Sequence, residues 1–458
     1  MFFRVKNLHF IGIGGIGMSG IAEVLLNQGF RVTGSDLLDS DLIERLRELG
    51  AGISIGHDAK NVHGAEVVVY SSAVKPDNVE YAEARRLGLP TIPRAEMLGE
   101  LMRMKYGIAV AGTHGKTTTT SMIAAIMTEA EMDPTFIVGG RVKSLATNAR
   151  LGSGEFLVAE ADEFDRSFLR LTPAIAVITT LETEHLDTYG DLEGIRRAFL
   201  QFAERVPFYG SIVLCRDEPT VASLIPDLRC PVITYGLESE ADITAQDLTF
   251  AQTRSQFDAV VRGQKRGRLS LNQPGRHNVK NALAAVGVAE ELKINFERIK
   301  KGLANFNGVE RRFEIKGEAG GVMVVDDYAH HPTEIRATLA AARQGWDRPI
   351  IAVFQPHLYS RTRDFAPAFG ESFSDADVLI ITGIYPAREE PIEGVSGQLI
   401  ADCAEKAGHH NVSYLEDKET LVPEILKLAG PGDMIVTLGA GDIWKVARDL
   451  FVKLGGGK

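Results

Sequence analysis

The chain has 458 residues, of which 45% are hydrophobic and 24% charged, a balance typical of globular proteins and a length sufficient for about three domains. Acidic residues outnumber basic ones by 61 to 50, and the net charge of −11 argues against nucleic acid as the main ligand, because like charges repel. The three cysteines are scattered, and no apolar run approaches the roughly 18 residues that span a bilayer. We expect a cytoplasmic protein without membrane insertion, in which any anion site is built locally.

Strand-like apolar runs alternate with amphipathic helical stretches, a rhythm typical of parallel sheets built from βαβ units. The pattern predicts an α/β protein of three domains. These are a Rossmann-like domain over residues 1–105, a central P-loop ATPase-like domain over 106–308 and a Rossmann-like C-terminal domain over 309–458. Residues 242–271 alternate apolar with polar side chains and are predicted to form antiparallel strands at one edge of the central sheet.

A glycine-rich loop, Gly12 to Gly17 (GIGGIG), lies between the first predicted strand and a helix. Such glycines let the backbone approach a phosphate at the helix N-terminus, and Asp36, which ends the next strand, is placed to accept hydrogen bonds from a ribose. Two other interpretations remain open at this point. The glycines could merely permit close packing of helix on strand, or the loop could belong to a nicotinamide dehydrogenase, which uses the same pattern.

A second loop, Gly112-Thr113-His114-Gly115-Lys116-Thr117-Thr118, lies between a predicted strand and a long helix. Its backbone N–H groups would cradle phosphates, Lys116 would neutralise the β and γ charge, and Thr117 would bind Mg²⁺. The spacing is shorter than in the general P-loop, because Val110 stands where the first glycine would be. A dehydrogenase has no use for this loop, whereas a non-catalytic ATP-binding regulator would.

Carboxylates and amides gather at two later junctions. Glu160 to Glu163 end a predicted strand, where a carboxylate suits Mg²⁺ held partly by phosphate oxygens, and His185 follows another strand as either a ligand or a structural side chain. Asn278, in the segment GRHNVKN, is placed to cap the following helix or to read a purine edge.

Two further strand-to-helix junctions lie in the last third of the chain. The segment DDYAHHPTE, from Asp326 to Glu334, is dense in groups that titrate. In the segment FQPHLYSRTRDF, Arg361 and Arg363 could bind a carboxylate as a fork or form surface salt bridges.

Taken together, these motifs resemble those of the Mur ligases of peptidoglycan synthesis, over essentially the whole chain. The stretches that carry the resemblance include HFIGIGGIGMSG, AGTHGKTTTTSM, EADE, GRHNVKNALAA, DDYAHHPTE and FQPHLYSRTRDF. The resemblance implies ATP-dependent ligation of L-alanine to the lactyl carboxylate of UDP-N-acetylmuramate through an acyl phosphate. The branch of the family that attaches a recycled murein tripeptide to the same nucleotide sugar is the alternative, although GIGGIGMSG and FQPHLYSRT are more similar to the alanine-adding branch.

The resemblance also implies roles for single residues, with ATP and Mg²⁺ as cofactors. The UDP substrate would contact Gly14, Gly15, Gly17, Asp36, His57, Ser71, Ser72 and Arg94. ATP would contact Gly112, Thr113, His114, Gly115, Lys116, Thr117, Thr118, His277, Asn278, Asn281, Arg312 and Asp327. The metal ligands would be Thr117, Glu160 and His185, and alanine would contact Tyr328, His357 and Arg361. The catalytic residues would be Lys116, Glu160, His185, Arg312 and His330, the last as a candidate base.

Two positions depart from the family pattern. Thr180 lies in the stretch Thr179–Glu182, where the family often has asparagine, and Phe164 stands where serine is commoner. The sequence leaves open whether these two changes alter the ATP site or the metal site.

Overall fold

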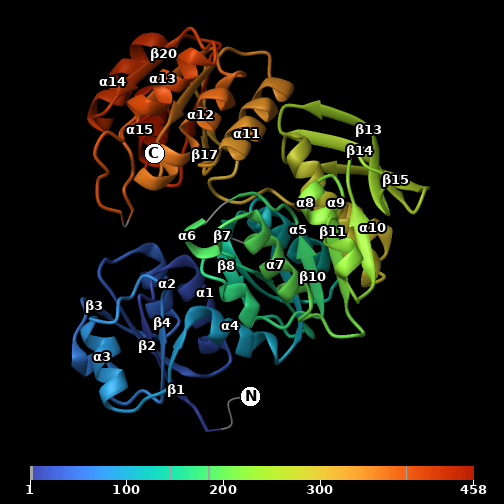
Figure 1. The fold of residues 1–458 in the computed structure, drawn as a ribbon, viewed down its shortest axis with the longest axis vertical. Helices are drawn as coiled ribbons and strands as arrows, with labels where there is room; N and C mark the ends of the chain where they lie inside the picture. Colours follow the sequence, from blue (N-terminus) through green and yellow to red (C-terminus); the bar gives the residue numbers. More distant parts are fainter. Residues whose placement is uncertain (1–3, 145–146, 184–185, 388, 458) are drawn as a thin grey trace. The chain divides into compact units, whose positions relative to one another are not determined.

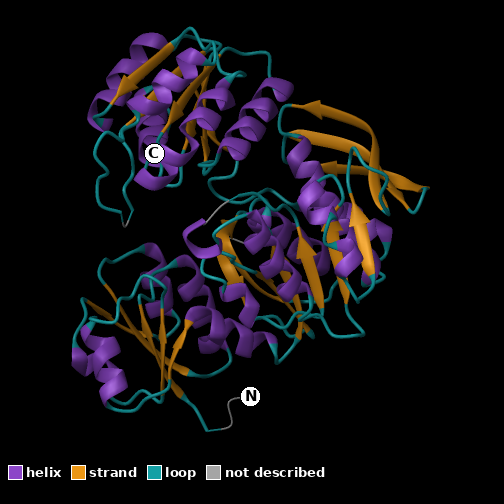
Figure 2. Cartoon of the chain, in the orientation of Figure 1, coloured by secondary structure: helices purple, strands orange, loops and turns teal. Residues whose placement is uncertain are grey.

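The computed structural model describes residues 4–144, 147–183, 186–387 and 389–457 (Figure 1). The chain divides into two compact units, each described here by itself. The first comprises Met1–Asp247, Phe257–Leu269 and Lys280–Asn307, and the second comprises Leu248–Gln256, Ser270–Val279 and Gly308–Lys458. The described residues form three sheets with helices between their strands, in agreement with the predicted three-domain α/β fold (Figure 2).

The first sheet has the order β3-β2-β1-β4-β5, and its neighbouring strands pair in parallel. Its strands are β1 (Asn7–Ile11), β2 (Arg31–Asp36), β3 (Gly52–Ile55), β4 (Val67–Tyr70) and β5 (Thr91–Pro93). Its helices are α1 (Ile16–Asn27), α2 (Asp41–Glu48), η1 (Ala59–Val62), α3 (Val79–Arg86) and α4 (Arg94–Met102). Strands β2 and β3 lie on one side of β1, and β4 and β5 lie on the other, so the strand order reverses between β1 and β4. Open α/β sheets bind ligands in the crevice at such a switch point.

The second sheet has ten described strands in the order β15-β14-β13-β12-β11-β10-β6-β9-β7-β8. Its strands are β6 (Tyr106–Ala111), β7 (Thr135–Val142), β8 (Thr147–Arg150), β9 (Phe156–Glu160), β10 (Ile175–Ile178), β11 (Ser211–Cys215), β12 (Val232–Tyr235), β13 (Ile243–Ala251), β14 (Arg254–Val261) and β15 (Gln264–Leu271). Its helices are α5 (Lys116–Glu129), η2 (Ser167–Arg170), α6 (Leu186–Tyr189), α7 (Leu192–Ala203), α8 (Pro219–Ala222), η3 (Ile225–Asp227), α9 (Arg276–Glu291) and α10 (Phe296–Asn305).

Two-residue turns join β13 to β14 and β14 to β15, and connections this short join only antiparallel neighbours. The predicted antiparallel strands over 242–271 are therefore confirmed at one edge of the central sheet. At the middle of the sheet, β6 pairs in parallel with β9 and β10, and all three strands are largely buried. Strands buried on both faces read as continuous apolar runs, which explains the uninterrupted IAVA and IAVI segments.

The third sheet has the order β16-β17-β21-β18-β19-β20, with β16 antiparallel and the others parallel. Its strands are β16 (Glu314–Ala319), β17 (Val322–Asp327), β18 (Ile350–Phe354), β19 (Val378–Thr382), β20 (Val412–Leu415) and β21 (Met434–Leu438). Its helices are α11 (Pro332–Gly345), α12 (Tyr359–Gly370), η4 (Glu371–Phe373), α13 (Gln398–Lys406), α14 (Lys418–Leu428) and α15 (Trp444–Lys453).

Alternate residues of β18 enter two hydrophobic clusters. Ala352 and Phe354 pack in a cluster with residues of α11, α12 and α13, whereas Ile351 and Val353 pack in one with residues of α14 and α15. Because side chains of a strand alternate between faces, the helices cover both faces of this sheet. Among the described residues, no helix is both long and apolar enough to cross a membrane.

Candidate functional sites at the strand ends

The first glycine-rich loop is held by Asp36. Gly12 adopts φ +78°, a left-handed conformation that glycine tolerates best, and the Gly14 N–H donates to Asp36 Oδ2 at 2.8 Å. A Cβ on Gly14 would lie 3.0 Å from the same oxygen, so the loop and the carboxylate are packed together. Asp36 Oδ1 accepts from the Leu37 N–H at 2.8 Å. The carboxylate predicted to meet a ribose therefore also shapes the loop.

The other residues predicted to contact the UDP substrate follow strands of the same sheet. His57 comes after β3, Ser71 and Ser72 come after β4, and Arg94 directly follows β5. Arg94 lies against the loop, since a Cβ on Gly17 would be 2.9 Å from its Nη1, and it pairs with Asp162 at 3.4 Å. Because parallel strands present their carboxyl ends at one edge, these side chains gather at the edge that carries the loop.

Glu80, on α3, organises this edge, and no sequence motif singled it out. Its side chain is fully buried and accepts from Ser35 Oγ at 2.5 Å and Asn61 Nδ2 at 2.6 Å, with His9 Nε2 at 3.3 Å. Burial opposes ionisation of Glu80, but hydrogen bonds from His9, Ser35 and Asn61 outweigh it and lower its pKa to about 2. Ser35 Oγ in turn lies 3.0 Å from His57 Nδ1, so Glu80 indirectly positions that imidazole.

A cavity of about 630 Å³ adjoins this edge within the first unit. Ser72 and Arg94 line it together with Phe164 and with Arg166, Arg170 and Arg205. The lining also includes Asp165, and two of the four arginines pair with acidic neighbours, Arg94 with Asp162 and Arg170 with Glu96. Basic side chains still outnumber acidic ones in this lining, in a chain of net charge −11. Phe164, the departure from the family pattern, therefore borders an anion-suited cavity as a 40% exposed ring.

The second glycine-rich loop, between β6 and α5, is braced by the strand end after β10. The His114 N–H donates to Thr180 Oγ1 at 2.8 Å, the Thr113 N–H donates to the Thr180 carbonyl at 2.9 Å, and Thr179 Oγ1 donates to the His114 carbonyl at 2.5 Å. A side chain at Gly112, which has φ +135°, would lie 2.1 Å from Thr179 Oγ1. Thr180 thus supports the loop. The resemblance of the motifs to the family did not predict this contact.

Lys116, at the start of α5, points its ammonium group back at the loop. Its Nζ donates to the Gly112 carbonyl at 2.5 Å, the Thr113 carbonyl at 3.1 Å and Glu163 Oε1 at 2.8 Å. Glu163 is buried, and burial raises its pKa to about 7 despite the nearby Lys116 charge. The lysine predicted to neutralise phosphates is thus held in the loop by oxygens of the protein.

Two of the three predicted metal ligands lie in the described first unit. Glu160 is the last residue of β9 and pairs in register with Val110, so its carboxylate lies at the strand edge from which the second loop departs. Its Oε1 accepts from the Gly139 N–H at 2.6 Å. Thr117 follows Lys116 in the first turn of α5. A hydroxyl and a carboxylate are hard oxygen donors and fit Mg²⁺. His185 lies outside the described residues.

Helix α9 carries the residues predicted to lie near adenine. Asn281 contacts the second loop, because a Cβ on Gly115 would lie 2.5 Å from its Oδ1, and Thr119 Oγ1 donates to that oxygen at 3.3 Å. Asn278 lies within the first turn, since the helix begins at Arg276, and its Nδ2 donates to the Pro274 carbonyl at 2.8 Å. Asn278 is therefore not the cap residue of α9. His277 lies beside Gly275, whose Cβ would be 2.9 Å from its ring.

In the second unit, Asp327 ends β17 and organises the segment before β16. Its Oδ2 accepts from the Phe313 N–H at 2.7 Å and its Oδ1 accepts from the Ala329 N–H at 2.8 Å. Burial raises the pKa of Asp327 to about 6. Arg311 and Phe313 both adopt positive φ, at 60° and 41°, and such strained conformations persist only where surrounding contacts hold them.

The guanidinium of Arg312 lies 5.3 Å from the centre of the Tyr328 ring and 3.8 Å from the Glu334 carboxylate. His330 Nδ1 lies 2.9 Å from the Tyr328 carbonyl. Because a carbonyl only accepts, Nδ1 carries the proton in this bond and Nε2 is the basic nitrogen of His330. The same Nδ1 lies 3.1 Å from the Glu334 carboxylate, which also accepts, so in the neutral ring Nε2 is the nitrogen that can take up a proton.

Aromatic rings connect His330 with the predicted amino-acid residues. The His357 ring is 5.8 Å from that of His330 in an edge-on arrangement. Burial, His330 and Arg361 together lower the pKa of His357 to about 3, so its imidazole is neutral at physiological pH. Arg361 lies in the first turn of α12. The structure thus brings Tyr328, His330, His357 and Arg361 together at the carboxyl ends of β17 and β18.

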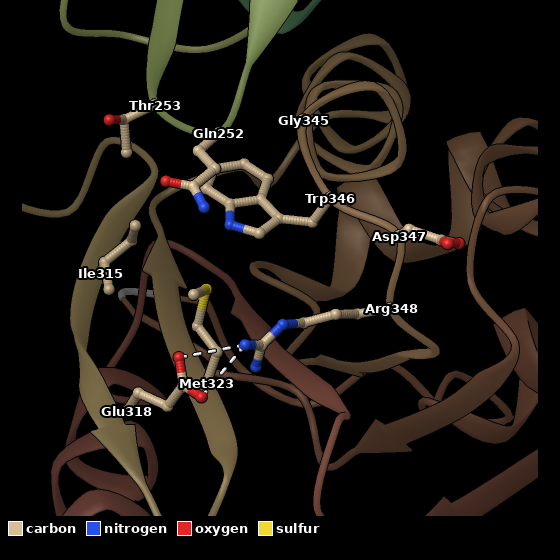
Figure 3. A pocket seen from close by; sticks show the side chains of 9 residues that line it. All are labelled: Gln252, Thr253, Ile315, Glu318, Met323, Gly345, Trp346, Asp347 and Arg348. Carbon is tan, nitrogen blue, oxygen red and sulfur yellow. Dashed lines mark hydrogen bonds and ion pairs between the residues drawn. The ribbon is translucent and has the colours of Figure 1, made fainter.

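A separate cavity of about 400 Å³ lies in the second unit between the turn at Gln252, the indole of Trp346 and Met323 (Figure 3). Arg348 Nη2 donates to both Glu318 carboxylate oxygens at 3.0 Å below it. Its lining includes none of the predicted site residues, so the candidate chemistry does not extend to this cavity.

Comparisons with known proteins identify the family of this chain. Residues 7–106 match the domain described as Mur ligase family, catalytic domain, residues 110–289 match the Mur ligase middle domain, and residues 311–441 match the Mur ligase, glutamate ligase domain. The chain therefore belongs to the Mur ligase family, as its motifs indicate.

Similar proteins within the family carry more specific names. The UDP-N-acetylmuramate–L-alanine ligase of Salinibacter ruber is 55% identical over 453 residues, which cover 98% of this chain and 95% of that protein. The solved structure of the UDP-N-acetylmuramate–alanine ligase of Thermotoga maritima is 29% identical and covers 98% of both chains with a TM-score of 0.82. A murein peptide ligase from Psychrobacter arcticus is 25% identical, covers 99% of both chains and has a TM-score of 0.73.

The buried network around Glu80 makes a first prediction. Glu80→Ala removes the acceptor that His9, Ser35 and Asn61 share, and removing one partner of a buried charged network costs about 3–5 kcal/mol of unfolding free energy. Glu80→Gln keeps the shape and one acceptor and should cost less, and Glu44→Gln on the exposed face of α2 should change little. Hydrogen exchange of the β1 and β2 amides in the whole chain measures the loss; equal protection in Glu80→Ala and wild type would contradict it.

The lowered pKa of Glu80 also predicts an acid sensitivity. A carboxyl whose pKa falls from its usual 4.5 to about 2 on folding stabilises the fold above pH 4.5, and this contribution is lost as the pH falls from about 4.5 towards 2. In Glu80→Gln this part of the pH dependence should be missing from amide exchange in β1 and β2.

Proposed function

We propose that this chain ligates L-alanine to the lactyl carboxylate of UDP-N-acetylmuramate at the expense of ATP, giving UDP-N-acetylmuramoyl-L-alanine, ADP and phosphate. One observation carries the proposal: the first unit holds two glycine-rich loops at strand ends, one beside Asp36 and one with Lys116. A dehydrogenase needs only the first loop, whereas an enzyme that joins a nucleotide-linked acid at the expense of ATP needs both. The 55% identity to an alanine ligase supports the choice of substrates.

In this proposal the first glycine-rich edge binds the UDP substrate, through Gly14, Gly15, Gly17, Asp36, His57, Ser71, Ser72 and Arg94. The loop at Asp36 receives the nucleotide, and the cavity lined by Ser72 and Arg94 offers positive charge to its anionic groups. Boundaries near residues 105 and 308 would then separate the UDP-binding, ATP-binding and amino-acid-binding domains.

The second loop binds ATP. The lactyl carboxylate attacks the γ-phosphorus, ADP leaves, and the acyl phosphate that forms is electrophilic enough for an amine to attack its carbonyl and expel phosphate. Phosphoryl transfer of this kind depends on positioning and on neutralisation of charge, which Lys116 supplies from the loop. Asn281, beside Gly115, fits a role in positioning the nucleotide, with His277 and Asn278 on the same helix.

Thr117, Glu160 and His185 would hold Mg²⁺, which when bound supplies further neutralisation of the phosphate charge. Arg312 and Asp327 are assigned to ATP by the resemblance of their motifs to the family. A cytoplasmic location belongs to the same proposal, because ATP is the energy source.

The amino-acid site is assigned to Tyr328, His357 and Arg361. A guanidinium fork binds the carboxylate of alanine in bidentate fashion, and His330 Nε2 is available to take a proton from its ammonium group. The alternative substrate, a murein tripeptide, is supported by the similarity to two solved murein peptide ligases, at 25% identity over 99% of this chain and at 30% identity over 67% of it.

The test is phosphate release from Mg-ATP with UDP-N-acetylmuramate, with L-alanine or tripeptide added separately. Release that depends on alanine, with a product heavier by one alanyl residue, supports the proposal. Release with tripeptide alone would assign the chain to the recycling branch, and no release with either would overturn the ligase function.

Lys116→Ala should lower phosphate release by at least about 100-fold, because the loop then lacks the charge that stabilises the transferring phosphoryl group. Binding of UDP-N-acetylmuramate, measured by calorimetry, should stay within about twofold of wild type. Lys60→Ala, an exposed lysine of the same unit, serves as the control. Normal turnover in Lys116→Ala would remove the phosphate role.

Asp36→Ala should weaken UDP-N-acetylmuramate binding by about 10-fold or more, because it removes a charged acceptor and also frees the Gly14 N–H. Asp36→Asn keeps an acceptor and should fall between Ala and wild type. Calorimetric Kd values for the three proteins decide the matter, and equal values would contradict the ribose assignment.

Arg361→Ala should raise the KM for L-alanine by about 10- to 100-fold, the cost of losing a hydrogen-bonded charge at the carboxylate. Arg363→Ala is the matched control on the same helix, since Arg363 is exposed and pairs with Asp364 at 2.7 Å. The KM for ATP should not change in either variant. An unchanged alanine KM in Arg361→Ala would move the amino-acid site elsewhere.

A further inference from the structure

His357 lies in the segment between β18 and α12 and is held by its neighbours in an unusual way. A histidine ring is ordinarily oriented by a hydrogen bond to one of its nitrogens. The Nδ1 of His357 is buried and has no hydrogen-bond partner among the described residues. No hydrogen bond at Nδ1 therefore fixes this imidazole, and two rings pack against it, that of His330 edge-on and that of Tyr385 nearly parallel.

Tyr385, after β19, is fixed to the His357 segment by its backbone. The Tyr385 N–H donates to the Pro356 carbonyl at 2.8 Å, and the Leu358 N–H donates to the Tyr385 carbonyl at 3.0 Å. These bonds form an isolated parallel bridge between His357 and Tyr385. The two rings stack with centroids 5.8 Å apart and an interplanar angle of 13°.

The Tyr385 ring also packs closely against the backbone at Gly441. A Cβ on Gly441, after β21, would lie 2.6 Å from Tyr385 Cγ and 2.4 Å from Gln355 Oε1. Gln355 is itself held, because its Nε2 donates to Asp442 at 3.0 Å and its Oε1 accepts from the Ile443 N–H at 3.2 Å. The Tyr385 ring thus packs against both the backbone at Gly441 and the imidazole of His357.

We propose that Tyr385 is a positioning residue for the acceptor amino acid, and that its ring fixes the plane of the His357 imidazole at the site where the amine must be presented. This inference rests on the proposed function. The neutral imidazole contributes a hydrogen-bonding nitrogen rather than a charge, so its value depends on direction, which the stacked ring supplies. The ring of Tyr385, and not its hydroxyl, makes this contact.

The experiment compares Tyr385→Phe, which keeps the ring, with Tyr385→Leu, which keeps apolar volume and loses the ring. Tyr385→Leu should raise the KM for L-alanine by roughly 3- to 10-fold, the range expected for losing an aromatic pair. The KM values for ATP and UDP-N-acetylmuramate should stay within about twofold, and Tyr385→Phe should behave as wild type in all three.

A double variant tests whether Tyr385 acts through His357. In a His357→Ala background the further change Tyr385→Leu should alter the alanine KM by less than about twofold, because the partner ring is already gone. Full additivity, an unchanged alanine KM in Tyr385→Leu, or an equal rise in all three KM values would overturn the inference, the last by showing a general loss of structure.

The failure of this inference can be told from a failure of the proposed function. If the wild-type chain releases no phosphate with alanine and UDP-N-acetylmuramate, the proposed function is wrong and the inference falls with it. If wild-type turnover is normal and Tyr385→Leu matches it at low alanine concentration, only the inference is wrong.

Discussion

Parallel pairing of strands is the constraint on which the candidate sites depend. It places the carboxyl ends of neighbouring strands at one edge, so the residues that follow them meet although they are far apart in the sequence. In the first unit this brings Asp36, Ser71 and Arg94 to one loop, and Lys116, Glu160 and Thr180 to the other. In the second unit the same rule gathers Tyr328, His357 and Tyr385. A reaction that needs several side chains at one place can therefore use residues at neighbouring strand ends, without a long loop to position them.

Buried carboxylates hold these edges in shape. Glu80 binds three side-chain donors around Ser35, Asp327 binds the backbone at Phe313 and Ala329, and Glu163 pairs with Lys116. Burying a charge is unfavourable unless the charge is fully hydrogen-bonded. The direction of each pKa change therefore follows from how many hydrogen bonds each carboxylate accepts. Glu80, with several donors, has a lowered pKa, whereas burial prevails at Glu163 and Asp327.

The motifs could be predicted from the sequence because each is local: a glycine-rich turn after an apolar strand and before a helix has one geometry. The antiparallel edge over 242–271 also follows from a local pattern, the alternation of apolar and polar side chains. Glu80 and Tyr385 could not be found in this way, because Glu80 reads as an ordinary helix residue and Tyr385 follows a strand without a motif of known chemistry. Their contacts join segments 45 and about 30 residues apart, and only the fold sets such pairs. Thr180 belongs with them, since its contact to the second loop depends on β6 and β10 being neighbours.

The contacts of Lys116 indicate which protein contacts a bound phosphate would have to replace. An ammonium group has three protons, and its contacts at Gly112, Thr113 and Glu163 can use all of them. A phosphate oxygen that binds this nitrogen would therefore replace a protein oxygen as its hydrogen-bond acceptor. Glu163 is the partner most readily replaced, because its pKa of about 7 lets it take up a proton when a second anion approaches, whereas the carbonyls belong to the loop itself. If Lys116 binds a phosphate as proposed, the free energy gained is thus the difference between two good contacts. The positive φ of Gly112 and Gly115, which glycine adopts without strain, shapes the loop around this lysine.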